Sequence, residues 1–113
     1  MSAVTRRSAI TGLSIALASP ALAQSGDVFR IGLILPMTGP FASTGRQIEA
    51  AIRAWLRANP APIAGKRIEI LLRDDTGVAP DVTRRLAQEL AVRERVQALA
   101  GFGLTPLALA AAP

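Results

Sequence analysis

A nearly continuous apolar run over residues 29–35, reading Phe, Arg, Ile, Gly, Leu, Ile, Leu, places the strongest constraint on the fold. Apolar side chains occupy adjacent positions of the run, so both faces of a strand built from it are apolar. This pattern is typical of a strand in a parallel sheet that carries helices on both faces. Pro36 ends the run. The run therefore predicts a buried strand of an α/β domain.

The segment after this strand predicts a loop and then a helix. Residues 37–45 contain glycine and proline at several positions, which indicates a loop leaving the carboxyl end of the strand. Over residues 46–59 apolar side chains recur at helical spacing, and Asn59 and Pro60 stop the helix. We expect one stripe of this helix to face the sheet, namely Ile48, Ala51, Ile52 and Trp55.

A second strand and a second helix follow. The strand is predicted over residues 67–73 and is closed by the acidic residues 74–75. The helix opens at Pro80 and continues through Glu89 and Arg93, whose spacing predicts an ion pair. Its predicted sheet-facing residues recur every fourth position: Val82, Leu86 and Leu90.

A third strand and helix complete the pattern. The strand is predicted over Val96–Ala100 and the loop over Gly101–Leu104. Thr105 is predicted to cap the third helix with its hydroxyl, and Pro106 to take the first helical position. The alternation of strands and helices predicts an α/β domain with a parallel sheet, right-handed crossovers and flanking helices.

Residues 1–23 are predicted to be a secretory signal peptide. Arg6 and Arg7 precede a mildly apolar run over residues 9–18, and small residues lead to an expected cleavage after Ala23. The run is too short for a bilayer, which requires about 20 predominantly apolar residues. The paired arginines also resemble a twin-arginine signal, so export by Sec or by Tat stays open. No cysteine follows the cleavage site, so no lipid anchor is expected.

Composition limits the chemistry of the mature segment. With the two signal arginines removed, the 13 basic residues fall to 11 against 8 acidic ones, a formal charge of +3 instead of +5. The arginine-rich stretch between Arg84 and Arg95 is interrupted by Glu89 and Glu94, so we expect a solvated face and no nucleic-acid partner. Histidine and cysteine are absent from the sequence, so the common bases, nucleophiles and metal ligands are missing. No cofactor or metal is expected.

In open parallel sheets ligands bind beyond the carboxyl ends of the strands. The loop that ends at Thr105 is the most informative, because the amides, the hydroxyl and the dipole at a helix start favour an anion such as a carboxylate. Ser43 and Thr44 offer hydroxyls from the first loop. Each interpretation has a plain alternative: Thr105 caps its own helix, and Ser43 and Thr44 are ordinary loop residues.

Two further patterns have simpler explanations than catalysis. Asp74 and Asp75 could form a catalytic pair, but adjacent carboxylates at a strand end more often bond loop amides. Gly101 and Gly103 suggest a nucleotide-binding loop, but Pro106 occupies the place of the third glycine and no lysine follows. We therefore expect no catalytic residue.

Residues 31–42, reading Ile, Gly, Leu, Ile, Leu, Pro, Met, Thr, Gly, Pro, Phe, Ala, with Gly45 shortly after, carry a family resemblance. They resemble the opening strand and loop of the leucine/isoleucine/valine-binding group of type I periplasmic binding proteins. The similarity continues through the strand that ends in residues 74–75, the helix from Pro80, and the strand and turn over residues 96–101.

This resemblance implies a two-lobed clamshell that holds a solute between its lobes and docks, when closed, on the permease subunits of an ABC importer. Residues 24–113 would form the N-terminal, incomplete part of lobe 1. The resemblance implies that Leu104 and Thr105 grip the carboxylate of the ligand. It also implies that Thr44 stands where many amino-acid binders have an aromatic residue that packs on the ligand.

The sequence thus leads to one functional prediction and two alternatives. The prediction is a periplasmic, non-enzymatic substrate-binding protein of an ABC importer, monomeric at full length, for amino acids or similar small carboxylated solutes. The alternatives are a ligand-sensing regulator on the same fold and an exported α/β enzyme domain with catalytic residues beyond Pro113. We also expect residues 24–113 alone to fold poorly, because a sheet edge stays uncovered. The predicted ligand-binding residues are Ser43, Thr44, Leu104 and Thr105.

Overall fold

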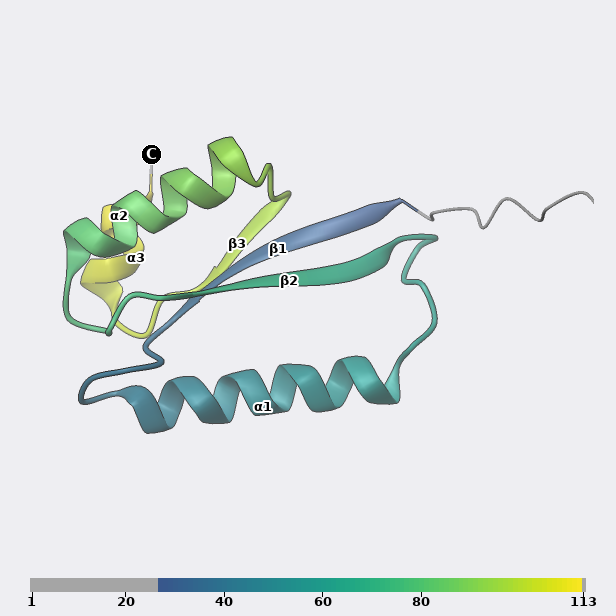
Figure 1. Cartoon of the computed structure of the whole chain (residues 1–113), viewed down its shortest axis with the longest axis horizontal. Helices are drawn as coiled ribbons and strands as arrows, with labels where there is room; N and C mark the ends of the chain where they lie inside the picture. The colour runs from purple at the N-terminus through teal and green to yellow at the C-terminus, as the bar shows by residue number, and fades with distance from the viewer. Residues whose placement is uncertain (1–26, 113) are drawn as a thin grey trace, which may run out of the picture.

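The computed structural model describes residues 27–112 and shows a three-stranded parallel sheet with helices on both faces (Figure 1). This confirms the predicted α/β fold. The predicted signal peptide lies outside the described residues. Among the helices of residues 27–112, none is long and apolar enough to cross a membrane. The elements in chain order are β1 (Val28–Leu35), α1 (Ala42–Ala58), β2 (Arg67–Asp74), α2 (Pro80–Gln88), the π-helical turn η1 (Glu89–Arg93), β3 (Ala98–Gly101) and α3 (Thr105–Ala111).

Strand β1 is the central strand of the sheet, between β2 and β3. It pairs with β2 along its whole length, from Val28 opposite Arg67 to Leu35 opposite Asp74. Strand β3 is shorter than predicted and pairs with residues 31–34 of β1. Because the strands are parallel, their carboxyl ends finish side by side at one edge of the sheet.

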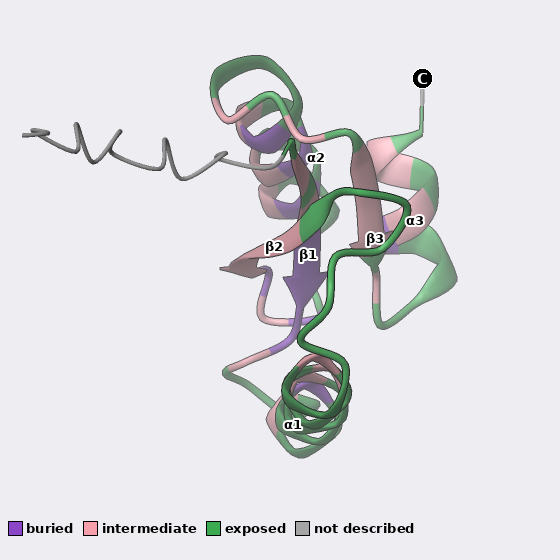
Figure 2. Ribbon diagram, turned by 90° about the vertical axis from the view of Figure 1, so that its right-hand side faces the viewer, coloured by how far each residue is buried: buried purple, intermediate pink, exposed green. Residues whose placement is uncertain are grey.

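Strand β1 is buried on both faces, as the apolar run predicted. Its last three residues, Leu33, Ile34 and Leu35, are at most 3% exposed. Helix α1 lies below the sheet in Figure 1, whereas α2 and α3 lie on the opposite face. Figure 2 shows the buried strand between these layers. Successive side chains of a strand point to opposite faces, so β1 packs against both helix layers.

The core on the α2 side is built around Ile34, Ala87 and Leu90. Gly32 lets the helix approach the sheet closely, because a Cβ there would lie 2.9 Å from Cδ1 of Leu90. Of the three side chains predicted to face the sheet from this helical segment, Leu90 is fully buried and the other two are partly buried. The prediction is confirmed for Leu86 and Leu90, which pack in this core, whereas the buried positions of α2 itself are Thr83 and Ala87, one residue beyond the predicted Val82 and Leu86.

The predicted orientation of α1 is wrong by a rotation about the helix axis. Ile48 and Trp55 were expected to face the sheet, but they are 37% and 52% exposed, and only Ile52 of the predicted stripe is partly buried. A Cβ at Gly45 would overlap the carbonyl oxygen of Pro36, so glycine at this position brings one particular side of the helix against the end of β1. The residues on the inner side are Gly45, Ile52 and Leu56.

Helix α1 also begins earlier than predicted, at Ala42. The N–H of Gly45 donates to the carbonyl of Phe41 at 3.2 Å, so helical hydrogen bonding already runs through residues that the sequence assigned to the loop. Ser43 and Thr44 therefore lie in the first turn of α1 and not in a loop.

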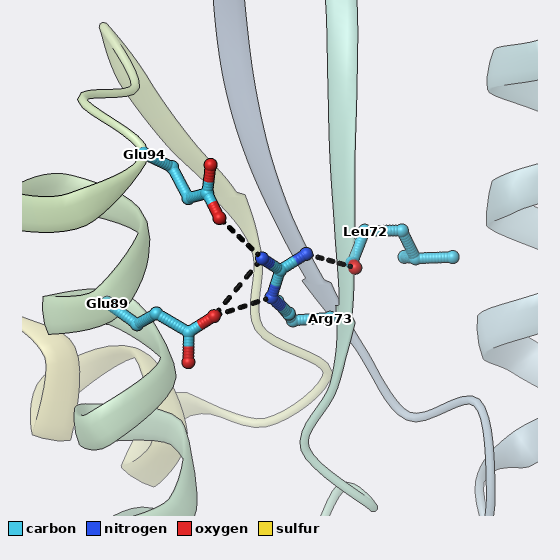
Figure 3. Close-up of polar contacts among 4 residues, drawn as sticks. All are labelled: Leu72, Arg73, Glu89 and Glu94. Atoms are coloured by element: carbon cyan, nitrogen blue, oxygen red, sulfur yellow. Dashed lines mark hydrogen bonds and ion pairs between the residues drawn. The ribbon is translucent and has the colours of Figure 1, made fainter.

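The second predicted helix does not continue regularly, because α2 passes into η1. There the N–H of Glu94 donates to the carbonyl of Glu89 at 3.2 Å. This spacing brings both glutamates to Arg73 of β2, at 3.1 and 3.2 Å from its Nη2, while Nη1 donates to the carbonyl of Leu72 (Figure 3). The predicted pair of Glu89 with Arg93 is wrong, because Glu89 pairs with Arg73.

Candidate functional site

The exit loops of the three strands lie together at one edge of the sheet, here named the carboxyl edge. They are the first exit loop (residues 36–41), the second exit loop (residues 75–79) and the third exit loop (residues 102–104). Helices α1 and α3 both start from this edge (Figure 1). An edge of this kind is where parallel sheets bind ligands, because loops and helix N-termini converge on it.

The carboxylate of Asp74 joins the first exit loop to the second. Its Oδ1 accepts hydrogen bonds from the N–H groups of Met37 at 2.9 Å, Thr38 at 3.3 Å and Thr76 at 2.8 Å. Its Oδ2 accepts one from the hydroxyl of Thr38 at 2.6 Å. Three of these four donors belong to the first exit loop, so one side chain at the end of β2 orients the chain that leaves β1.

The same contacts determine the charge of Asp74. Partial burial acts to raise the pKa of its carboxyl group. The hydrogen bonds from the Thr38 hydroxyl and from the N–H groups of Thr76, Met37 and Thr38 outweigh this and hold the pKa below its ordinary value of 3.8. The group therefore stays ionised at neutral pH and accepts all four hydrogen bonds as a carboxylate.

Asp75 lies deeper, and its side chain bonds the second exit loop and the first turn of α2. It is fully buried, its Oδ1 accepts from the N–H of Gly77 at 2.9 Å, and its Oδ2 accepts from the hydroxyl of Thr83 at 3.0 Å. Both aspartates thus bond loop amides and hydroxyls, as the turn interpretation predicted. The contact between Thr38 and Asp74 was not predicted, because it depends on the register of two strands.

The third exit loop is held against the end of β1. Gly101 has φ +105°, a conformation that favours glycine, and a Cβ there would overlap the carbonyl oxygen of Ile34. The next residue, Phe102, donates its N–H to the same oxygen at 2.9 Å. The start of α3 is therefore set by direct backbone contact with the central strand.

Two of the predicted ligand residues lie at the start of α1. Ser43 and Thr44 are exposed in its first turn, immediately before the glycine that contacts Pro36. The hydroxyl oxygen of Ser43 accepts a hydrogen bond from Nε2 of Gln47 at 3.3 Å, one turn along the helix. The helix start thus presents two adjacent hydroxyl groups at the carboxyl edge.

The other two predicted residues lie at the start of α3, shifted by one position from the prediction. Leu104, not Thr105, is the N-cap residue, and its carbonyl accepts hydrogen bonds from the N–H groups of Leu107 and Ala108. Thr105 is the first helical residue and Pro106 the second, and no side chain caps the helix. The cap assignment for Thr105 is therefore wrong.

The carboxyl edge offers hydroxyl and amide groups from two helix starts on opposite faces of the sheet. No hydrogen bond joins Ser43 or Thr44 to Leu104 or Thr105 within residues 27–112. In the same residues no three carboxylate, imidazole or thiol groups gather as they would around a metal ion. An open depression of about 610 Å³ lies elsewhere, over the outer side of α2 and η1. The arrangement is suited to binding an anion or a hydrogen-bonding solute.

Comparison with known proteins places the chain in a family. Residues 28–113 match the family described as periplasmic binding protein. A protein of Brucella abortus (strain 2308) described as Leu/Ile/Val-binding protein homolog 6 is 37% identical over 108 residues, which cover 96% of this chain and 27% of that protein. The chain therefore spans about a quarter of the length of such relatives.

Solved structures show the same similarity. A solute-binding protein of an ABC transporter from Rhodopseudomonas palustris BisB5, in complex with 3,4-dihydroxybenzoic acid, is 55% identical with a TM-score of 0.74, covering 77% of this chain and 24% of that one. A leucine-binding protein from Thermotoga maritima MSB8 is 28% identical with a TM-score of 0.66, covering 74% and 23%. The chain therefore belongs to the type I periplasmic binding proteins, in the group that includes the leucine/isoleucine/valine-binding proteins.

Proposed function

We propose that the protein is an exported substrate-binding protein that carries a small aromatic carboxylate to the permease of an ABC importer. The observation that carries this proposal is the ligand of the solute-binding protein that is 55% identical to the chain, 3,4-dihydroxybenzoic acid. A second solute-binding protein, from Rhodopseudomonas palustris HaA2, is 40% identical and was solved with p-hydroxybenzoic acid. Both ligands combine a carboxylate with phenolic hydroxyl groups.

The polar groups of the carboxyl edge support a ligand of this class. Ser43, Thr44 and Thr105 present hydroxyls that can donate to a carboxylate or exchange hydrogen bonds with a phenol. The first amide of α3 and its dipole also favour a negative group. We propose that Leu104 contributes apolar contact with the aromatic ring, since its side chain is 40% exposed at the same helix start.

Asp74 and Asp75 both use their oxygens for loop amides and hydroxyls, so we assign neither of them to the ligand. Branched-chain amino acids are the second candidate ligands, supported by the relative described as a Leu/Ile/Val-binding protein homolog.

A binding experiment tests this proposal. The full-length secreted protein is titrated calorimetrically with benzoate, 4-hydroxybenzoate, 3,4-dihydroxybenzoate, leucine, isoleucine and valine. We expect binding of the hydroxybenzoates and none of the amino acids. The neutral analogue 4-hydroxybenzamide should bind about tenfold or more weakly, because hydrogen bonds to a charged group contribute about 1.5–3 kcal/mol. Binding of leucine alone would favour the second candidate, and binding of none would refute the proposal for this class.

Site variants test the predicted residues separately. Thr44→Ala and Thr105→Ala should weaken hydroxybenzoate binding, whereas Arg57→Ala, an exposed change in the last turn of α1, should leave it unchanged. If the wild-type protein and the three variants bind hydroxybenzoate with equal affinity, Thr44 and Thr105 are not ligand-binding residues. Recovery of chemically unchanged ligand after long incubation would exclude the enzyme alternative, and loss of ligand uptake on gene deletion would separate transport from sensing.

A further inference from the structure

We propose that Asp74 is a positioning residue for ligand binding, which orients the start of α1 by holding the first exit loop in one conformation. This inference rests on the proposed function, in that the start of α1 contacts the ligand. Asp74 is not one of the predicted ligand-binding residues. It acts on the site through Thr38 and the first exit loop.

Pro36, the first residue of the first exit loop, is fully buried, but the later residues of the loop have little burial to hold them in place. Residues 38–41 are exposed, so apolar packing contributes little to their order. Three hydrogen bonds from this loop end on the single carboxylate of Asp74, through the N–H of Met37 and through the N–H and hydroxyl of Thr38. Hydrogen bonds to a charged acceptor are roughly twice as strong as neutral ones. The carboxylate is therefore the main hydrogen-bonding restraint on residues 37–38 of the loop.

The restraint reaches the predicted site through a short connection. Ser43 and Thr44 follow Thr38 by only a few residues, and the N–H of Ala42 already bonds the carbonyl of Gly39 at 3.2 Å. Gly45, which follows Thr44 directly, holds the helix against the end of β1 through its close contact with Pro36. The segment that carries the two hydroxyls is thus held at both ends, and Asp74 supplies the restraint at the first end.

Asp75 provides a matched comparison within the same turn. It is more deeply buried than Asp74, but its side chain bonds only Gly77 and Thr83, in the connection from β2 to α2. Asp75 therefore stabilises the fold without touching the first exit loop. Asp74→Asn and Asp75→Asn make the same chemical change on two carboxylates with different partners.

The experiment compares Asp74→Asn, Asp75→Asn, Thr38→Val and Thr38→Ser in the full-length secreted protein. Calorimetric Kd values for hydroxybenzoate are measured well below the Tm of each variant. We expect Asp74→Asn and Thr38→Val to raise Kd about tenfold, as loss of one charge-assisted hydrogen bond predicts. Thr38→Ser keeps the hydroxyl group, so its Kd should equal that of the wild-type protein. Asp75→Asn should lower Tm at least as much as Asp74→Asn while changing Kd less than about twofold.

A Kd that rises equally in both aspartate variants, or in neither, would overturn the inference. If Asp74→Asn does not fold, the Kd values of Thr38→Val and Thr38→Ser test the inference, because Thr38 is exposed and its substitution should not prevent folding. Amide hydrogen exchange separates failure of the inference from failure of the proposed function. Even if the wild-type protein binds no hydroxybenzoate, Asp74→Asn should speed exchange in residues 37–45 and Asp75→Asn in residues 76–83. Unchanged exchange over residues 37–45 in Asp74→Asn would also overturn the inference.

Discussion

The hydroxyl of Thr83 donates a hydrogen bond to Oδ2 of Asp75 at 3.0 Å, and both residues are fully buried. The bond joins the end of β2 to the first turn of α2. A buried carboxylate is stable only if its oxygens have partners, so this pair determines how the second exit loop leads into the helix.

Replacing Thr83 with valine should destabilise the protein by about 1–3 kcal/mol, because the change keeps the shape but leaves Oδ2 of Asp75 without its partner. The measurement is urea unfolding followed by circular dichroism. Thr83→Ser is the control, since it keeps the hydroxyl and should lose less stability than Thr83→Val. A valine variant as stable as wild type would contradict the role of this bond.

Gly45→Ala should destabilise the protein although the residue is helical. In an exposed helix alanine is more stable than glycine by about 1 kcal/mol. At this position the new Cβ would overlap the carbonyl oxygen of Pro36, so the helix must move away from β1. Ala54→Gly, at an exposed position of α1, measures the propensity difference alone. A more stable Gly45→Ala protein would show that the contact with Pro36 can relax freely.

Arg73→Met should cost about 1 kcal/mol at low salt, because it leaves Glu89 and Glu94 facing each other without a cation. The three side chains are 26%, 35% and 41% exposed, so salt should reduce the difference between the two proteins. Arg53→Met, which breaks an exposed pair within α1, is the control and should cost less than about 0.5 kcal/mol. Equal losses of stability in Arg73→Met and Arg53→Met would contradict a stabilising role for the ion pairs between β2 and η1.

Stability should depend on pH through Asp74. Its folded-state pKa is lowered, so its contribution is fully present above the unfolded value of 3.8 and is lost as pH falls through the lower folded value. Urea unfolding of wild type and Asp74→Asn between pH 7 and pH 2.5 measures this. The stability difference between them should hold down to about pH 4 and shrink below it. A difference that does not change with pH would contradict the assigned charge state.

The mature protein should begin at Gln24. Expression in a Gram-negative host, isolation of the periplasmic fraction and intact-mass measurement test this. Ala23→Phe should block cleavage, because the site requires small residues. Arg6→Lys combined with Arg7→Lys separates the export routes, since it should abolish Tat export and leave Sec export working. A cytoplasmic product that retains residues 1–23 would refute the secreted form.

Much of the fold could be predicted because its signals are local. The apolar run of β1, the adjacent acids at the end of β2 and the glycine and proline residues of the loops each predicted an element or a turn that the structure confirms. The ligand residues remain a prediction. The fold places these residues at the carboxyl edge. Their contacts with a ligand depend on how their side chains are arranged in space, which the periodicity of the sequence does not predict.

The sequence by itself determined which segments form strands and helices and that the strands are parallel, because these depend on apolar periodicity and on breaker residues within each segment. Only the tertiary structure decided the rotation of α1, the start of α3 and the π-helical turn after α2. The physical reason is that these depend on contacts between different elements, such as Gly45 of α1 with Pro36 at the end of β1 and Arg73 of β2 with Glu94 after η1. The energies of such contacts cannot be inferred from the residue pattern within a single segment.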